Sequence, residues 1–129
     1  MITMFFRDGD DVWVTDKCCV VRDRGQGAAF GVEVATPPNF HAMLAEGRKG
    51  TLCVPTHRGP MPMVGQAPEY VWLGNVKLAR GYWFAVTALY GNKVEWLTNG
   101  PNNFVAAVAD DAVVALVMPV RQDQPEHLH

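Results

Sequence analysis

The stretch "PPNFHAMLAEGRKGTLCVP", residues 37–55, has a near copy later in the chain, "PNNFVAAVADDAVVALVMP", residues 101–119. The two align without a gap and share seven identities in nineteen positions. Abundant Ala and Val account for part of this likeness. They do not account for the aligned first and last prolines or for the matching pairs Asn39-Phe40 and Asn103-Phe104. We therefore predict an internal duplication.

Each copy has the pattern of a helix followed by a strand. Apolar residues recur at i, i+3 and i+4 from the phenylalanine, which is typical of one helical face. A proline near the start suits the first turn, where its missing N–H costs nothing. This pattern predicts short helices over about residues 38–47 and 102–110. The runs "TLCV" and "AVVALVM" then predict strands, and a proline closes each of them.

Segments rich in β-branched and aromatic residues precede both predicted helices and favour strands. They are "DVWVTDKCCVV" and "AAFGVEVA" in the first half, and "EYVWLGNVKLA", "YWFAVTALY" and "KVEWLT" in the second. Gly91-Asn92 has the composition of a two-residue hairpin turn. Each half, about residues 6–55 and 70–119, is then a ββ(β)αβ unit.

Two such halves must bury their sheet faces against each other. The expected fold is α+β: a β-rich small barrel or sandwich with an approximate internal two-fold axis. The order of elements resembles the duplicated ββαβ units of double-psi and related cradle-loop barrels. The segment "YGNKVEWLTNGP" is also similar to the closing glycine-turn strand of the vicinal-oxygen-chelate fold. We expect one domain over residues 1–120, with a linker loop at 56–69 and a flexible tail at 121–129.

Bulk properties exclude several classes of protein. The 129 residues suit a single domain, and 49% of them are apolar, which excludes a disordered chain. The net charge of −2 and the absence of a basic face argue against a nucleic-acid partner. No window reaches the ~18 apolar residues of a membrane span. The acidic N-terminal region does not resemble a secretory signal. Three cysteines, two of them adjacent, suit reduced thiols, so we expect a cytoplasmic protein.

Catalytic and metal-binding patterns are absent from the sequence. The four histidines have no metal-ligand spacing, and the chain contains no serine for a triad. We therefore expect no metal and no cofactor, and the sequence favours a protein that is not an enzyme without deciding the point. Two catalytic alternatives stay open for a hydrolase or lyase. One is a thiol pair of Cys53 with His57 or His41, and the other is the carboxylate pair Glu33/Glu95.

Aromatic, methionine and arginine side chains suggest recognition instead. Tryptophan is enriched at interfaces, and methionine adapts to irregular surfaces. An arginine beside the turn at 25–27 could receive an anion. The segment "THRGPMPMVGQAPE", residues 56–69, combines Met, Pro and basic residues. The candidate binding residues are Trp13, Arg24, His57, Arg58, Met61, Met63 and Trp83.

The functional expectation is a non-catalytic binding protein that acts by protein–protein interaction or sequestration. Its aromatic and Met-Pro surface would contact a partner protein or a second copy of the chain. The alternative is a small-ligand-binding barrel of the sequestering or resistance type, with a cleft between the two halves. Sites of that kind prefer junctions between structural units.

Overall fold

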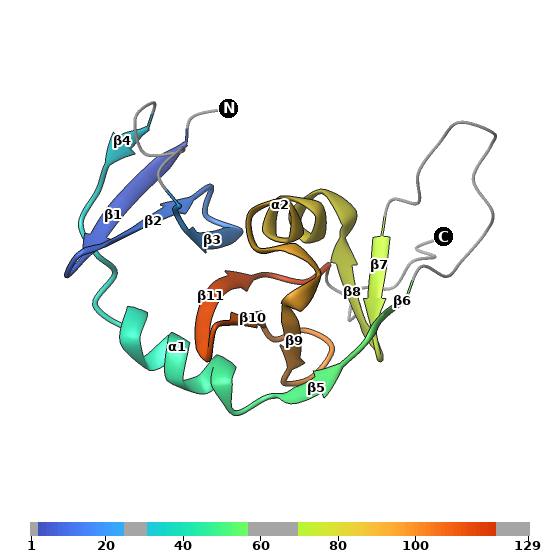
Figure 1. Ribbon diagram of the computed structural model, residues 1–129. Coiled ribbons are helices and arrows are strands. Elements are labelled where there is room, and N and C mark those ends of the chain that lie inside the picture. Colours follow the sequence, from blue (N-terminus) through green and yellow to red (C-terminus); the bar gives the residue numbers. More distant parts are fainter. Residues whose placement is uncertain (1–2, 25–30, 57–69, 121–129) are drawn as a thin grey trace, which may run out of the picture.

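A computed structural model describes residues 3–24, 31–56 and 70–120 of the chain (Figure 1). The helices are α1 (Phe40–Arg48), α2 (Arg80–Tyr90) and the short 3-10 helix η2 (Gly91–Lys93). The strands are β1 (Met4–Asp8), β2 (Asp11–Thr15), β3 (Cys19–Arg22), β4 (Val32–Glu33), β5 (Thr51–Cys53), β6 (Pro55–Thr56), β7 (Tyr70–Leu73), β8 (Val76–Ala79), β9 (Glu95–Thr98), β10 (Val105–Ala109) and β11 (Ala112–Val117). The predicted β-rich α+β class is confirmed.

The strands form one large and one small sheet. The large sheet has the order β4-β1-β2-β3-β11-β10-β9-β5, and its neighbours are antiparallel except for the parallel pair β1–β4. Pairing of β3 with β11 joins the N-terminal strands to the C-terminal hairpin. In the described residues this sheet is open, with β4 at one edge and β5 at the other, so of the predicted barrel or sandwich the closed barrel is not present.

The small sheet, β6-β7-β8, is connected to the large one by very short links. Only Val54 separates β5 from β6. Helix α2 begins on the residue after β8, and η2 carries the chain from α2 towards β9 of the large sheet. Helix α2 therefore bridges the two sheets (Figure 1).

The centre of the large sheet is buried on both faces. Every residue of β10 is buried, and its side chains alternate between two apolar clusters. Ala106 and Val108 pack with Met43 and Leu44 of α1. The opposite face of β10 packs against α2 and the small sheet. The buried members of that second cluster are Cys19, Leu73, Val76, Leu78, Val86, Tyr90, Trp96, Val105, Ala107, Ala109, Val114, Ala115 and Val117.

Helix α1 approaches this sheet very closely. A Cβ atom added to Gly47 would lie 2.8 Å from the Cβ of Ala106 and 3.1 Å from the Cδ2 of Leu116. Real Cβ atoms almost never show the first of these contacts, so only glycine fits here. The approach also requires a small residue at position 106, where the sheet faces the helix.

The predicted helix over 102–110 is wrong. Residues 105–109 form β10, paired with β11 through a two-residue turn. Asp110 and Asp111 both have positive φ, 53° and 63°, as a type I′ hairpin turn requires. The stretches 37–55 and 101–119 therefore adopt different secondary structures, and the structure does not show the predicted duplication. They are packing partners, because α1 rests on β10 and β11.

The predicted strand over 82–90 is also wrong, because these residues belong to α2. Gly91 is not in a hairpin turn; with φ 76° it follows the last residue of α2 and ends the helix. The first predicted helix is confirmed as α1, and so are the strands at 51–53 and 112–117. The predicted domain limits stay a prediction, and the tail at 121–129 and most of the linker lie outside the described residues.

Candidate functional site

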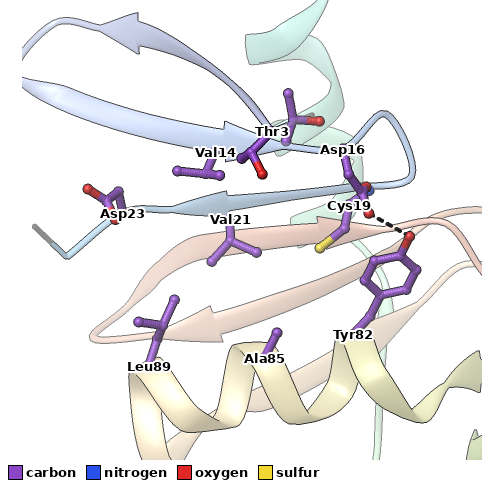
Figure 2. A pocket seen from close by; sticks show the side chains of 10 residues that line it. Thr3, Val14, Asp16, Cys19, Val21, Asp23, Tyr82, Ala85 and Leu89 are labelled. Carbon is purple, nitrogen blue, oxygen red and sulfur yellow. Dashed lines mark hydrogen bonds between the residues drawn. The ribbon is translucent and has the colours of Figure 1, made fainter. Parts of the chain in front are cut away.

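An open cleft of about 360 Å³ lies between the β2–β3 hairpin and α2. In Figure 2 the hairpin forms one wall, and Tyr82, Ala85 and Leu89 follow one another along the facing side of α2. This spacing of three and four residues puts them on one helical face. The cleft is lined by Thr3, Val14, Thr15, Asp16, Cys19, Val21, Asp23, Tyr82, Ala85 and Leu89.

The β2–β3 turn organises one end of the cleft around Asp16. The Asp16 Oδ1 atom accepts hydrogen bonds from the backbone N–H groups of Cys18 and Cys19, both at 2.9 Å. The turn needs such support because Lys17 has a positive φ of 80°. The other carboxylate oxygen of Asp16, Oδ2, accepts a 2.7 Å hydrogen bond from the Tyr82 hydroxyl (Figure 2). The carboxylate thereby ties the first turn of α2 to the turn between the strands.

The ionisable hydroxyl and thiol of the cleft stay neutral at ordinary pH. The pKa of the Cys19 thiol is raised to about 12, mainly by burial. The negative charges of Asp16 and Cys18 also raise this pKa. The hydrogen bond to Asp16 is the main cause that raises the pKa of Tyr82, and burial adds to it. The thiolate is the nucleophilic form of cysteine, so Cys19 is not an activated nucleophile.

The far end of the cleft is formed by Asp23 and Leu89 (Figure 2). Arg24 lies next to this end. Its Nη1 donates to the Leu89 carbonyl at 3.2 Å, and its guanidinium lies 5.1 Å from the centre of the Tyr90 ring. The Tyr90 hydroxyl donates to the Arg22 carbonyl at 2.7 Å. These contacts fix the last turn of α2 to the end of β3.

The structure does not bring together the two tryptophans that were predicted to be binding residues, Trp13 and Trp83. Trp13 is 3% exposed and packs on the α1 side of the sheet, with its ring centre 4.9 Å from that of Phe40. Trp83 is half-buried and packs against the cluster on the α2 side. Neither lines the cleft beside α2. The other predicted binding residues, His57, Arg58, Met61 and Met63, lie outside the described residues.

A second hollow, of about 410 Å³, lies under α1 and includes Trp13. Its charged residues have both signs, so it does not favour a ligand of one charge. They are Asp8, Asp11, Arg22, Arg48 and Asp111. Arg48 donates to the Asp111 carbonyl at 2.7 Å, and His41 pairs with Asp8 at 2.8 Å. These contacts connect α1 to the hairpin turns around it.

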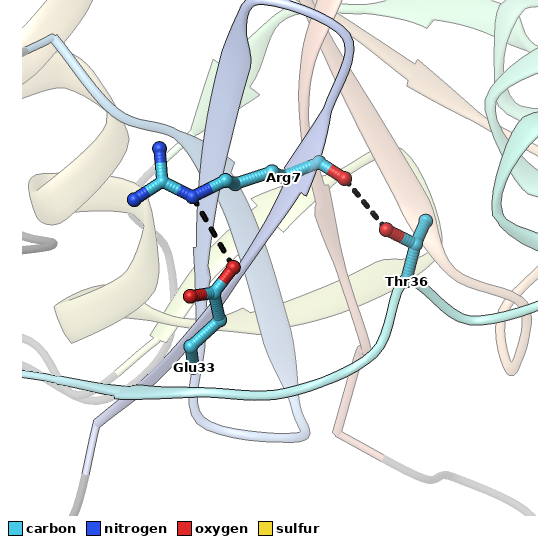
Figure 3. A network of polar contacts seen from close by, with 3 residues as sticks. All are labelled: Arg7, Glu33 and Thr36. Atoms are coloured by element: carbon cyan, nitrogen blue, oxygen red, sulfur yellow. Dashed lines mark hydrogen bonds and ion pairs between the residues drawn. The ribbon is translucent and has the colours of Figure 1, made fainter.

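The catalytic alternatives find no support in the described residues. Glu33 on β4 forms an exposed ion pair with Arg7 at 3.2 Å, while Thr36 donates to the Arg7 carbonyl (Figure 3). Glu95 lies on β9, which five strands separate from β4, so the two carboxylates are not a pair. The Sγ of Cys53 lies 3.4 Å from the Thr98 hydroxyl oxygen, and His57 is outside the described ranges. No three His, Cys, Asp or Glu side chains group as metal ligands within residues 3–24, 31–56 and 70–120.

Sequence reasoning missed the residues that shape the cleft. The sequence analysis places Asp16 and Cys19 in a strand segment and counts Cys19 among the reduced thiols, but it assigns neither residue to a site. The helical spacing of Tyr82, Ala85 and Leu89 was present in the sequence. Counting that period over residues 82–90 would have indicated one helical face, and hence a wall facing the sheet.

No protein family model matches the chain, and no curated protein or solved structure is significantly similar to it. Among the described residues, neither helix is long and apolar enough to cross a membrane.

Proposed function

We propose that the protein is a non-catalytic binding protein that takes up a small, largely apolar molecule in the cleft beside α2. The observation that carries this proposal is the cleft itself, about 360 Å³ with walls of Val14, Val21, Ala85 and Leu89. That volume is within the usual range of about 300–1,000 Å³ for small-ligand sites. A few polar groups at the ends of an apolar site are also typical of ligand pockets.

The state of the reactive groups supports binding over catalysis. Cys19 keeps its proton at neutral pH, and the Tyr82 hydroxyl is already donated to Asp16. An enzyme site needs an activated nucleophile or a base with a matched pKa. The described lining residues are mostly apolar, and the Asp16 carboxylate among them already accepts three hydrogen bonds.

Filling the cleft tests the proposal. Ala85 is exposed on α2 and lines the cleft, whereas Ala88 is exposed on the same helix and does not. Binding of the neutral probe phenylbutanol is measured by ligand-observed NMR to the wild-type chain, Ala85→Trp and Ala88→Trp. We expect Ala85→Trp to abolish binding and Ala88→Trp to keep it. Equal binding to all three proteins would place the probe elsewhere and contradict the proposal.

The partner-protein interpretation has one observation in its favour. Leu52 and Val54 are 57% and 76% exposed, and they lie in and beside β5, an edge of the large sheet. Exposed apolar edges can pair with another chain. A monomeric sedimentation coefficient at high concentration would contradict the version in which the partner is a second copy.

A further inference from the structure

We propose that the molecule taken up by the cleft beside α2 is a cation, with an amine or quaternary ammonium group on an apolar body. This inference rests on the proposed function and adds the chemical class of the ligand. It follows from the signs of the charges that line the cleft and from the way one of them is held.

The charged residues among the ten that line the cleft are both acids, Asp16 and Asp23. Arg24 follows Asp23 in the chain, but it donates to the Leu89 carbonyl, lies over Tyr90 and does not line the cleft. The apolar walls strengthen the field of the Asp16 carboxylate inside the cleft. An anionic ligand would be repelled there, while a cation would be attracted.

The end of the cleft at Asp16 combines a carboxylate with an aromatic ring, and both groups attract ammonium ions. The Tyr82 ring and the Asp16 carboxylate are held together by the 2.7 Å hydrogen bond. A carboxylate accepts up to about four hydrogen bonds. Asp16 accepts three, two at Oδ1 and one at Oδ2, so it retains acceptor capacity. The ring face adds a favourable cation–π interaction for a positive group placed against it.

The two acids lie at opposite ends of an apolar floor (Figure 2). Val21 and Cys19 lie between them on β3, and Val14 lies on the neighbouring β2. At about 3.3 Å per strand residue, the four steps from Cys19 to Asp23 span about 13 Å. This arrangement fits an elongated apolar body whose positive group lies beside Asp16.

The test uses three probes with one apolar body and different charge: phenylbutylamine, which is cationic at neutral pH, neutral phenylbutanol and anionic phenylbutyrate. Dissociation constants for the full chain are measured by isothermal titration calorimetry at low and high salt. We expect phenylbutylamine to bind at least about tenfold more tightly than phenylbutyrate at low salt, with phenylbutanol between them. Salt should reduce the preference, because it screens the charges.

The variant Asp16→Asn keeps an oxygen for the two backbone N–H groups and removes the charge. It should weaken phenylbutylamine about threefold or more while phenylbutanol changes little. Asp10→Asn removes a charge from an exposed turn residue that does not line the cleft, and it should leave all three affinities unchanged. Circular dichroism spectra that match the wild type show that each variant is folded.

The outcomes separate the two proposals. Equal or tighter binding of phenylbutyrate, with phenylbutanol still excluded by Ala85→Trp, overturns the cationic class and leaves the proposed function standing. Failure of all three probes to bind the wild-type chain overturns both. A preference for the amine that Asp10→Asn removes as fully as Asp16→Asn also overturns the inference, because it would reflect overall charge.

Discussion

The two helices cover opposite faces of the same sheet in different ways. Helix α1 lies so close to β10 and β11 that no side chain fits at Gly47. Helix α2 packs on the cluster around Val86 and Tyr90 but stands away from the β2–β3 hairpin and leaves the cleft. The difference shows that one face of the sheet is closely packed, while part of the other face borders an open cleft.

The largest expected effect comes from breaking the close packing under α1. Gly47→Val places a branched side chain where a single Cβ would already lie 2.8 Å from Ala106. Since helix and sheet must move apart, we expect a loss of about 3 kcal/mol in the free energy of unfolding, measured with denaturant. Gly81→Ala on α2 is the matched control, because a Cβ there meets nothing within 4 Å. It should raise stability by up to about 1 kcal/mol. A loss below about 1 kcal/mol for Gly47→Val would mean that α1 can shift.

A smaller effect is expected from the contact that holds α2 at its distance from the hairpin. Tyr82→Phe removes the hydrogen bond to Asp16 and keeps the ring. A hydrogen bond to a charged group at a partly exposed site stabilises by about 1.5 kcal/mol, and chemical unfolding should show that loss. Tyr70→Phe is the comparison, since the Tyr70 hydroxyl makes no hydrogen bond with the rest of the described chain. Equal stability changes in the two variants would contradict the role of the Tyr82–Asp16 hydrogen bond in holding α2 at its distance from the β2–β3 hairpin.

The smallest effect concerns the cleft-side thiol and appears only in alkali. The pKa of the Cys19 thiol is raised from its ordinary value of 9.0 to about 12 in the folded chain. Above pH 9 the unfolded chain therefore loses this proton before the folded one, and stability falls as pH rises towards 12. Between pH 8 and pH 10 this contributes a loss of about 1 kcal/mol. In Cys19→Val the decrease over that interval should be smaller by this amount. Identical pH profiles for the two proteins would show that the thiol is not desolvated.

The sequence allowed the class of fold to be predicted, together with the strands that have strong β-branched patterns. It also allowed α1 to be predicted, since Phe40, Met43 and Leu44 have a clear helical period and straight-chain residues surround them. The same period in 104–108 was misleading. There Val105 and Val108 favour a strand, and the decisive signal was the turn at Asp110-Asp111, which was interpreted as the end of a helix.

The cleft could not be predicted because it depends on which elements pack together. Residues 82–90 were assigned to a strand from their aromatic and β-branched content, and that assignment removed the helix that forms one wall. Alternation along a strand and a helical face were both consistent with this apolar run, and tertiary packing decided between them. The closeness of α1 to the sheet also arises from contacts between Gly47 and residues about sixty positions away.

The short connections at both ends of α2 have a consequence for the kinetics of the proposed ligand uptake. No loop separates the helix from β8, and only η2 and Val94 separate it from β9, so both of its ends are anchored to sheets. A lid needs a hinge that absorbs backbone rotation, and this helix has little room for one at either end. We expect ligand to enter and leave through the open side at a rate set by diffusion and by its affinity, without a slow gating step.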